Sequence, residues 1–244
     1  MNVWGIADLH LSGARPDRRE RHAARWKDHT ERIAGEWRTV VGPDDVVLIP
    51  GDISMARNHR ELQPDLEWLE RLPGLKVLSA GNHDVWWNGV ERIRPMLRKS
   101  LRAVGGGAIS VGDVIVCGTR GTPVLNDEAP AAAVAEEKRE IERLDRALKG
   151  ALALRTANLP VFVLWHYPPF DAHRRPGPCV ALLERAGVTA CVYGHAHAEG
   201  QWGGLVQGAV NGVCYHGVAA DAVGFRPYRL ANLTHGPVFS GTTS

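Results

Sequence analysis

The sequence predicts an α/β fold, with parallel strands joined by crossover helices over the first two-thirds of the chain and a more antiparallel region after them. Short apolar runs bounded by turn residues alternate with longer amphipathic stretches as far as about residue 193. From about Val213 onward, the chain carries several short strand-like runs separated by turns. Its 244 residues are 44% hydrophobic, which is enough for a sizeable core, and we expect a single domain over residues 1–244.

Three strand–helix units occupy the first hundred residues. Apolar runs of strand length predict buried strands over Val3–Ala7, Val46–Ile49 and Lys76–Ser79. Amphipathic stretches between and after them predict helices over Trp26–Val41, Glu61–Leu72 and Val90–Leu101. The turn residues Gly42 and Pro43 end the first of these helices.

The second half of the chain begins with a hairpin and a long helix. Gly112 and Asp113 predict a tight turn between strands over Ala108–Val111 and Val114–Gly118. A stretch rich in Ala, Glu and Arg predicts a helix over Ala131–Leu154. Two more strands are expected on either side of a helix over Val180–Ala186, at Val161–Trp165 and Val188–Tyr193.

Five polar clusters each fall directly after a predicted strand. In open α/β sheets, ligands bind beyond the carboxyl ends of the parallel strands, so these clusters are expected to converge on one crevice. Each cluster alone is typical of a turn or an ordinary histidine, whereas the five together favour a shared site. The clusters are Asp8-Leu9-His10, Gly51-Asp52, Gly81-Asn82-His83-Asp84, His166 and Gly194-His195-Ala196-His197.

The residue types in these clusters are typical of a metal site. Asp, His and Asn supply oxygen and nitrogen ligands without a thiolate, a mixture that suits Mn, Fe or Zn. In an extended segment, two residues spaced as Asp8 and His10 point to the same side, and His195 and His197 share that spacing. Asn82 adds a neutral carbonyl oxygen, which completes a ligand shell without placing more negative charge beside an anionic substrate.

In this order, the clusters resemble the motifs of the calcineurin-like metallophosphoesterase superfamily. That family carries Asp-x-His, Gly-Asp, Gly-Asn-His-Asp/Glu, a lone His and Gly-His-x-His, and all five blocks occur here between Asp8 and His197. The resemblance implies a two-sheet mixed β-sandwich flanked by helices. It also implies an enzyme that hydrolyses phosphate esters with two divalent metal ions, for which Mn is favoured and Fe and Zn are the alternatives.

The resemblance also implies roles for individual residues. A hydroxide held between the two ions would attack phosphorus, and His83 would contact the phosphate and protonate the leaving group. Asp84 is interpreted either as a partner that orients His83 or a ligand histidine, or as a residue that caps the next turn. The implied ligands are Asp8, His10 and His197 for the first metal, Asn82, His166 and His195 for the second, and Asp52 as the bridge between both.

The sequence departs from the phosphoprotein phosphatases of this superfamily. Those enzymes carry Asp-Arg-Gly shortly after the bridging Asp, whereas here Asp52 is followed by Ile53-Ser54-Met55-Ala56-Arg57. The chain more closely resembles the small bacterial phosphohydrolases of the superfamily. We therefore favour a phosphodiesterase acting on nucleotide-like or nucleic acid substrates. The alternatives are a phosphomonoesterase, a DNA or RNA nuclease, and a non-catalytic binding scaffold of the same fold.

Candidate substrate contacts lie in the loops around the clusters. Trp86 and its neighbour Trp87 would stack on a flat leaving group, or would pack the following helix against the core. Arg120 would bind a phosphate oxygen, or would form a surface ion pair. His173 would widen an anion-binding rim, or would belong to a solvated loop. His216 lies on a late strand, and the sequence assigns it no role.

Composition and cysteine spacing predict the location of the protein. The formal net charge is +2, which speaks mildly against a strong polyanion-binding field. No apolar run is long enough to span a membrane, and the N-terminus lacks the pattern of a secretory signal. The four cysteines are widely spaced and form no Cys-x-x-Cys pair, which is unlike a disulfide framework. We expect a cytoplasmic protein without a membrane partner; the sequence leaves the oligomeric state open.

Overall fold

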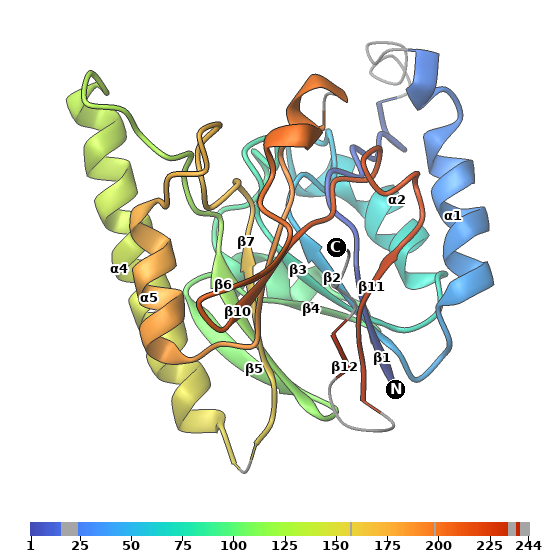
Figure 1. Cartoon of the computed structure of the whole chain (residues 1–244). Coiled ribbons are helices and arrows are strands. Elements are labelled where there is room, and N and C mark those ends of the chain that lie inside the picture. Colours follow the sequence, from blue (N-terminus) through green and yellow to red (C-terminus); the bar gives the residue numbers. More distant parts are fainter. Residues whose placement is uncertain (16–23, 157, 198, 234–237, 240–244) are drawn as a thin grey trace.

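The computed structural model describes residues 1–15, 24–156, 158–197, 199–233 and 238–239, and it contains two stacked six-stranded β-sheets flanked by helices (Figure 1). The strand order is β12-β11-β1-β2-β3-β4 in the first sheet and β5-β6-β7-β8-β10-β9 in the second. This confirms the predicted α/β sandwich. The strands are β1 (Asn2–Gly5), β2 (Val46–Pro50), β3 (Leu75–Ser79), β4 (Leu101–Ala103), β5 (Gly107–Val111), β6 (Val114–Thr119), β7 (Val161–Trp165), β8 (Ala190–Tyr193), β9 (Gly208–Val210), β10 (Val213–Gly217), β11 (Tyr228–Asn232) and β12 (Val238–Phe239).

The helices lie on the two outer faces of the sandwich, α1 and α2 on the first sheet and α4 and α5 on the second (Figure 1). Between the sheets lies a core of apolar side chains that includes Val3, Leu48, Val116 and Phe162. The helices are α1 (His29–Val40), α2 (His59–Glu70), α3 (Val90–Ile93), α4 (Ala131–Leu154) and α5 (Pro178–Ala186), with short 3-10 segments η2 (Ala24–Trp26), η3 (Arg94–Met96) and η4 (Glu199–Gly204).

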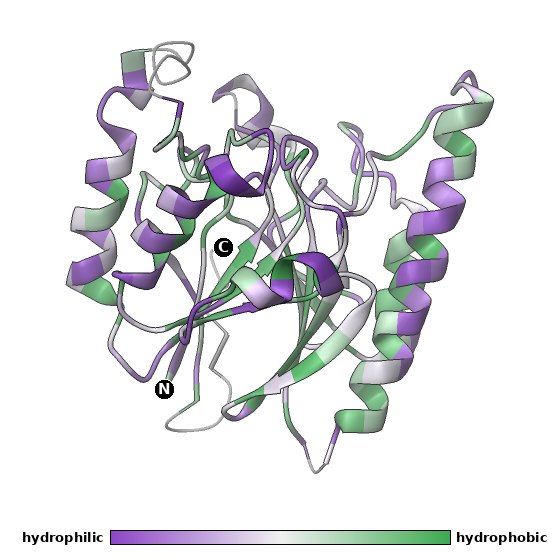
Figure 2. Ribbon diagram, turned by 180° about the vertical axis from the view of Figure 1, so that it is seen from behind, coloured by the Kyte–Doolittle hydropathy of each residue, from purple (hydrophilic) through white to green (hydrophobic). Residues whose placement is uncertain are grey.

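The long helix α4 carries hydrophilic and hydrophobic residues in alternating patches along its length (Figure 2). Its buried side chains include Leu144 and Leu148, which pack on the second sheet. Among the described residues, no helix combines the length and the apolar composition that crossing a membrane requires.

Parallel pairing brings the carboxyl ends of the central strands to one edge of the sandwich. Strands β1, β2, β3 and β4 run parallel in the first sheet, and β6, β7, β8 and β10 run parallel in the second. Strands β11 and β12, together with β5 and β9, pair antiparallel at the outer positions. The five clusters therefore follow strands that all end on the same side, which is the condition for a shared site.

The predicted helix over Val90–Leu101 is wrong for most of its length. It ends as α3 at Ile93, continues for one 3-10 turn through Pro95, and gives way to strand β4, which begins at Leu101. Proline cannot donate the backbone hydrogen bond that a continuing α-helix needs. Leu101 then pairs with Lys76 and extends the first sheet by one parallel strand.

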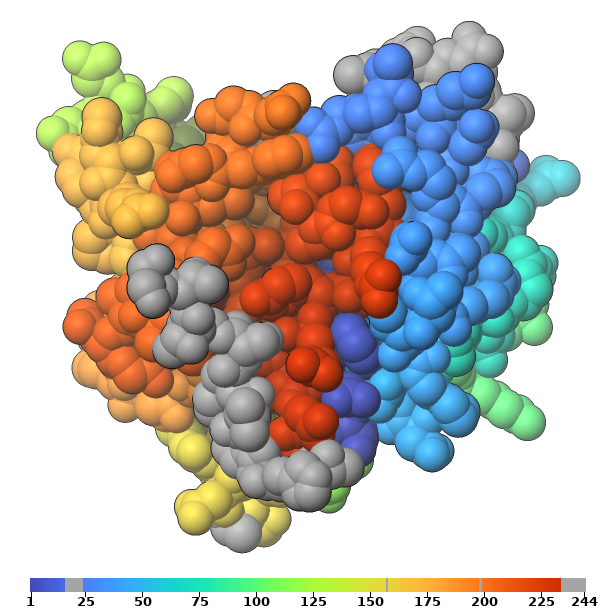
Figure 3. Space-filling model, turned by 45° about the vertical axis from the view of Figure 1, so that its right-hand side comes forward, coloured from blue at the N-terminus to red at the C-terminus, as the bar shows by residue number. Residues whose placement is uncertain are grey.

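The late strand β11 lies beside β1, so the two ends of the chain share one sheet. Asn2 and Val3 pair with Asn232 and Ala231 in an antiparallel register. Figure 3 shows the residues of β1 on the surface, between segments from the end of the chain and the segment that contains α1. This pairing joins residues that are over 200 positions apart, and local sequence patterns do not encode it.

Asp45, directly before β2, ties the N-terminal strand to the turn after α1. Its carboxylate accepts hydrogen bonds from the Asn2 N–H at 2.7 Å, the Trp4 indole N–H at 2.9 Å and the Gly42 N–H at 3.0 Å. Burial alone would raise the pKa of Asp45, but these hydrogen bonds lower it below the usual value.

We expect Asp45→Ala to lower the free energy of unfolding by about 2–4 kcal/mol, because three donors lose a charged acceptor. The difference from wild type should narrow as the pH falls through the lowered pKa of folded Asp45, since the stabilisation requires the ionised carboxylate. Urea unfolding followed by circular dichroism measures both effects. Asp44→Ala is the matched control, because the neighbouring Asp44 is exposed; equal losses in the two variants would contradict this role of Asp45.

Candidate metal centre

The loops after β1, β2, β3, β7 and β8 meet at the carboxyl edge of the sandwich. Backbone hydrogen bonds join them, from Asp8 N–H to the Gly51 carbonyl at 3.1 Å and from Gly194 N–H to the His166 carbonyl at 2.8 Å. The His195 N–H donates to the Asp8 carboxylate at 2.9 Å, which links the last cluster to the first across 187 residues of sequence. The predicted convergence of the five clusters is therefore present.

The structure brings all seven predicted ligands together. Asn82 Oδ1 lies 2.9 Å from His166 Nε2 and 2.9 Å from His195 Nδ1, so one oxygen and two ring nitrogens face a common point. Ligand atoms also form two overlapping groups, and within each group they lie within 4.8 Å of one another. One group is Asp8, His10 and His197, and the other is Asp8, Asp52 and His166.

Asp52 lies at the centre of this cluster. Its Oδ1 accepts a hydrogen bond from the His83 N–H at 2.8 Å. Its Oδ2 is buried, accepts no hydrogen bond within the described part of the chain, and lies 3.6 Å from His166 Nε2 and 3.9 Å from His10 Nε2. A buried carboxylate oxygen without a donor is costly, and a cation shared between the two ligand groups would offset that cost. The residues present therefore fit the implied metal pair.

His166 is held in the tautomer that a metal ligand requires. Its Nδ1 lies 2.9 Å from the Pro50 carbonyl oxygen, which only accepts hydrogen bonds, so the tautomer with the proton on Nδ1 satisfies this contact and leaves Nε2 available to a metal ion. The lone pair of Nε2 then points into the cluster. A hydrogen bond of this kind from the other ring nitrogen is typical of histidines that bind metal ions.

Burial shifts the pKa values of the cluster in the directions that favour a bound cation. It lowers the pKa of His166 to about 3 and that of His195 to about 4, so both rings are neutral at pH 7 and keep a free lone pair. Burial also raises the pKa of Asp8, as does the neighbouring charge of Asp52, and burial raises the pKa of Asp52. Adjacent buried carboxylates resist ionisation until a positive charge lies beside them.

Strained backbone conformations and close packing both occur at the cluster. Asp8, His10, Asp52 and His195 all adopt positive φ angles between 43° and 68°, which non-glycine residues rarely do. Such conformations persist only where the surrounding structure enforces them, and they are frequent at functional sites. Gly81 is needed for the approach of two of the loops, because a Cβ there would lie 2.1 Å from Asp52 Oδ1.

Asp84 binds backbone rather than a histidine ring. Its Oδ1 accepts hydrogen bonds from the Ile53 N–H at 2.9 Å and the Ser54 N–H at 3.1 Å, and its Oδ2 accepts one from the Gly81 N–H at 2.8 Å. The buried carboxylate thus joins the loop after β2 to the loop after β3. The hydrogen bonds of Asp84 in the described structure therefore match neither expected role, the partner of a histidine or the cap of the next turn, and make it a bridge between two loops. Burial and the charge of Asp52 raise the pKa of Asp84 to about 7.

We expect Asp84→Ala to destabilise the metal-free protein by about 2–4 kcal/mol, because three buried N–H groups lose their acceptor. Asp84→Asn should be milder, since its amide oxygen still accepts the hydrogen bonds from Ile53 and Ser54. Thermal and urea unfolding measure both changes. The exposed Asp127→Ala serves as the control, and an Asp84→Ala protein as stable as this control would refute the loop-joining role.

The other predicted residues occupy different environments. His83 is exposed at the mouth of the cluster, with its ring 5.5 Å from that of His10. Trp86 is 1% exposed and its indole N–H donates to the Ser54 carbonyl, so it packs in the core and the predicted substrate contact is wrong. His173 is exposed in a turn where its N–H binds Asp171, apart from the ligand groups described above. His216 is buried inside the sandwich, paired in register with Val192.

Arg120 forms the ion pair that is one of the two interpretations offered for it. Its side chain pairs with Glu136 and is about a third exposed, while its backbone carbonyl accepts the His166 N–H at 3.0 Å. It also lines a cleft together with Gly81 and Asp84. The ion pair is therefore present, and it lies directly beside the cluster.

Three residues of this neighbourhood are absent from the sequence-based assignment of the site. The ring centroids of Tyr167 and His195 lie 4.4 Å apart, and those of Trp26 and His10 lie 5.7 Å apart. The charge of buried Asp221 contributes to the raised pKa of Asp8. Asp221 follows strand β10, which pairs parallel with β8, whereas the sequence predicts a more antiparallel tail; the strand-end rule that located the five clusters therefore did not extend to it.

Comparisons with known proteins agree with this geometry. A family model described as calcineurin-like phosphoesterase matches residues 1–199. The Gene 66 protein of Mycobacterium phage D29 is 33% identical over 124 residues, which cover 45% of this chain and 61% of that protein. The Gene 66 protein of Mycobacterium phage L5 is 37% identical over 83 residues, 34% of this chain and 40% of that protein. The chain thus spans less than two-thirds of either relative.

A solved structure shares the fold. The crystal structure of phosphopantetheinyl hydrolase from Mycobacterium tuberculosis aligns with a TM-score of 0.55 at 16% identity, covering 97% of this chain and 98% of that chain. At this identity the likeness is one of architecture, and it agrees with the two-sheet sandwich described above.

Proposed function

We propose that this chain, which belongs to the calcineurin-like phosphoesterase family, is a phosphodiesterase acting on nucleotide-like substrates. Its fold and its Asp/His cluster support metal-dependent hydrolysis of phosphoesters. The observation that carries this proposal is the buried Asp52 carboxylate, flanked by histidine nitrogens from the β1 and β7 loops, with the exposed His83 beside it. An anionic ester needs a metal-binding centre that is accessible from solvent, and this arrangement provides one.

In this proposal, Asp8, His10 and His197 would hold one divalent ion, Asn82, His166 and His195 would hold the other, and Asp52 would be the ligand shared by both. Mn is favoured, with Fe or Zn as alternatives, because the ligands are oxygen and nitrogen atoms only. When bound, two such ions supply an acidified water as the nucleophile and positive charge for the phosphoryl oxygens.

His83 is proposed to protonate the leaving oxygen. Its backbone N–H is anchored to Asp52 Oδ1 at 2.8 Å, so the residue is tied to the centre of the cluster while its side chain stays accessible to solvent. A proton donor at this position stabilises the alkoxide that forms when the ester bond breaks. The Asp84 carboxylate supports this position indirectly, by joining the two loops that carry Asp52 and His83.

The charges around the cluster favour a diester over a monoester. A monoester dianion carries one more negative charge, which phosphatases offset with arginine side chains. Here the Arg57 guanidinium binds Glu61 on the surface, and the Arg120 guanidinium is paired with Glu136. Ser54, close to the position where the phosphatase motif falls, donates its hydroxyl to Asp65 instead. A monoanionic phosphodiester needs no further cation.

A hydrolysis panel with Mn tests the proposal. We expect faster turnover of bis-p-nitrophenyl phosphate than of p-nitrophenyl phosphate, and turnover of both should stop when a chelator removes the metal. Faster turnover of the monoester would make the protein a phosphomonoesterase. A phosphopantetheinyl ester belongs in the panel, because the solved structure of similar fold is named a phosphopantetheinyl hydrolase. If no ester in the panel is hydrolysed, the binding-scaffold alternative replaces the enzyme.

Nuclease activity is the second enzymatic candidate. It requires binding along a nucleic acid backbone, with an affinity that falls steeply as salt is added. The formal net charge of +2 provides little long-range attraction for a polyanion. Incubation with single- and double-stranded oligonucleotides at low salt tests this candidate, and intact oligonucleotides would remove it.

A further inference from the structure

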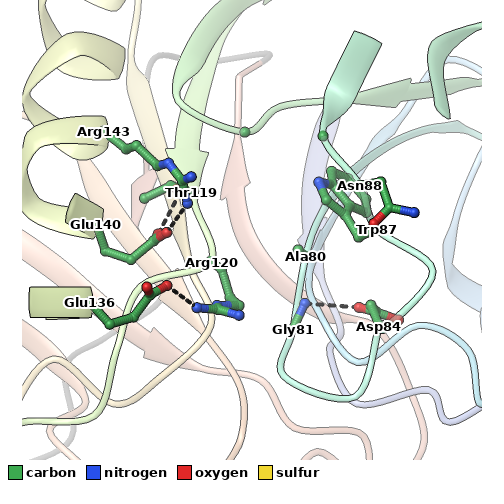
Figure 4. A pocket seen from close by; sticks show the side chains of 12 residues that line it. Ala80, Gly81, Asp84, Trp87, Asn88, Thr119, Arg120, Glu136, Glu140 and Arg143 are labelled. Atoms are coloured by element: carbon green, nitrogen blue, oxygen red, sulfur yellow. Dashed lines mark hydrogen bonds and ion pairs between the residues drawn. The ribbon is translucent and has the colours of Figure 1, made fainter. Parts of the chain in front are cut away.

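A cleft of about 320 Å³ opens beside the cluster, between the loop after β3 and the surface formed by β6 and α4 (Figure 4). Gly81 and Asp84, from the loop that carries Asn82 and His83, form one part of its lining. Arg120 forms another, and its carbonyl accepts the backbone N–H of His166. The cleft therefore adjoins two of the loops that would hold the metal pair, within reach of a substrate bound there.

The charged wall of the cleft is already neutralised by its own ion pairs. Arg120 is paired with Glu136, and Arg143 with Glu140 (Figure 4). Glu140 is buried and also accepts hydrogen bonds from the Thr119 hydroxyl and the Gly121 N–H. Neither guanidinium is left without a carboxylate partner, so the cleft offers little net positive charge for a second phosphate group.

One donor in this wall has no partner within the described structure. The Nε atom of Arg120 is buried and makes no hydrogen bond there, although a terminal nitrogen of the same guanidinium binds Glu136. An unpaired buried N–H favours a ligand that brings an acceptor atom to it. Because Glu136 holds the guanidinium in place, little conformational entropy is lost when such a ligand binds.

The opposite wall of the cleft holds a positioned indole ring. Trp87 is half-buried and lines the cleft, and its backbone N–H donates to the Asp84 carbonyl at 2.8 Å. Its ring lies 5.4 Å from that of the buried Trp86. An indole ring that packs against a buried ring and lines a cleft is suited to stacking.

We propose that this cleft binds a neutral, planar, hydrogen-bonding ring of the substrate, a nucleobase, which stacks on Trp87 and accepts a hydrogen bond from Arg120 Nε. The proposal rests on the phosphodiesterase function proposed above and adds the side chains that select the substrate. It narrows the sequence-based expectation, in which both Trp86 and Trp87 are candidates for stacking, and it assigns Arg120 a contact with the ring in place of the phosphate contact that was one of its two interpretations. The paired charges of the wall favour the neutral ring over an anionic group.

Three p-nitrophenyl phosphodiesters test the proposal, since they share one scissile bond and differ only in the second ester group: methyl, thymidine or 2-phosphoethyl. We expect the wild type to prefer the thymidine ester over the methyl ester in kcat/KM by roughly 5- to 150-fold, the equivalent of one stacked base. Trp87→Leu and Arg120→Gln should each remove most of that preference. The half-buried Trp68→Leu and the surface-paired Arg98→Gln are the matched controls and should retain it.

Equal kcat/KM for the thymidine and methyl esters, or a preference that Trp87→Leu leaves intact, would overturn the proposal. A preference for the phosphoethyl ester that depends on Arg120 would also overturn it, by identifying an anion site. If none of the esters is hydrolysed, the phosphodiesterase function fails, and the cleft is then tested by calorimetric titration of the metal-loaded protein with thymidine. Binding that is lost in Trp87→Leu would support the cleft, and no binding by the wild type would refute it.

Discussion

Replacing Asp52 with asparagine is expected to lower the turnover of phosphodiesters by about 10³-fold or more, because charge stabilisation by bound ions is worth several kcal/mol. Asp52 is the buried carboxylate at the centre of the cluster, and its Oδ2 lies between the ring nitrogens of His10 and His166. An amide there presents less negative charge to two cations, so the variant should also retain less metal. Elemental analysis of protein purified with Mn measures the metal content alongside the activity.

The same substitution is expected to leave the metal-free protein at least as stable as the wild type. The amide oxygen keeps the hydrogen bond from the His83 N–H, and removing the charge relieves the repulsion between Asp52 and Asp8. The melting temperature of the metal-free variant therefore distinguishes the loss of a metal ligand from a loss of folding stability. Asp113→Asn, in the exposed β5–β6 turn, is the control. Full metal content and activity in Asp52→Asn would show that Asp52 is not the shared ligand.

Replacing His83 with alanine is expected to slow hydrolysis of an alkyl phosphodiester by about 10²- to 10⁴-fold, the usual contribution of a general acid. The loss should be much smaller for a p-nitrophenyl ester, because p-nitrophenolate leaves as a stable anion without a proton. Metal content should stay at the wild-type level, since His83 is not among the proposed ligands. Steady-state kinetics with both substrates, at fixed Mn, measure the difference.

An equal loss with both leaving groups would contradict the role of His83 as a proton donor. It would instead place the side chain in phosphate binding or in the positioning of Asp52, to which its backbone is anchored. His83→Gln helps to separate these cases, because glutamine keeps a hydrogen-bond donor for the phosphate but does not supply a proton. Partial activity in His83→Gln with the p-nitrophenyl ester, and little with the alkyl ester, is the pattern that the proposal predicts.

The site was largely predictable because its residues follow strands in a fixed order. Each cluster, such as Asp8-Leu9-His10, stands where a buried apolar run ends, and parallel strands bring such ends to one edge. The sequence could not distinguish Trp86 from Trp87, because adjacent indoles have the same composition but different environments. Trp86 packs in the core, and Trp87 lines the cleft. It also left two roles open for Asp84, whose partners lie about 30 residues away in another loop.

By itself, the sequence determined the fold class, the five clusters and the chemistry that their residue types allow, because hydrophobic periodicity and strand-end motifs are local properties of the chain. Only the tertiary structure decided which side chains meet: β11 beside β1, Asp221 beside the cluster, and Arg120 facing Trp87 across a cleft. These contacts join residues that lie far apart in sequence. They depend on how the two sheets and their helices pack, and no local pattern encodes that packing.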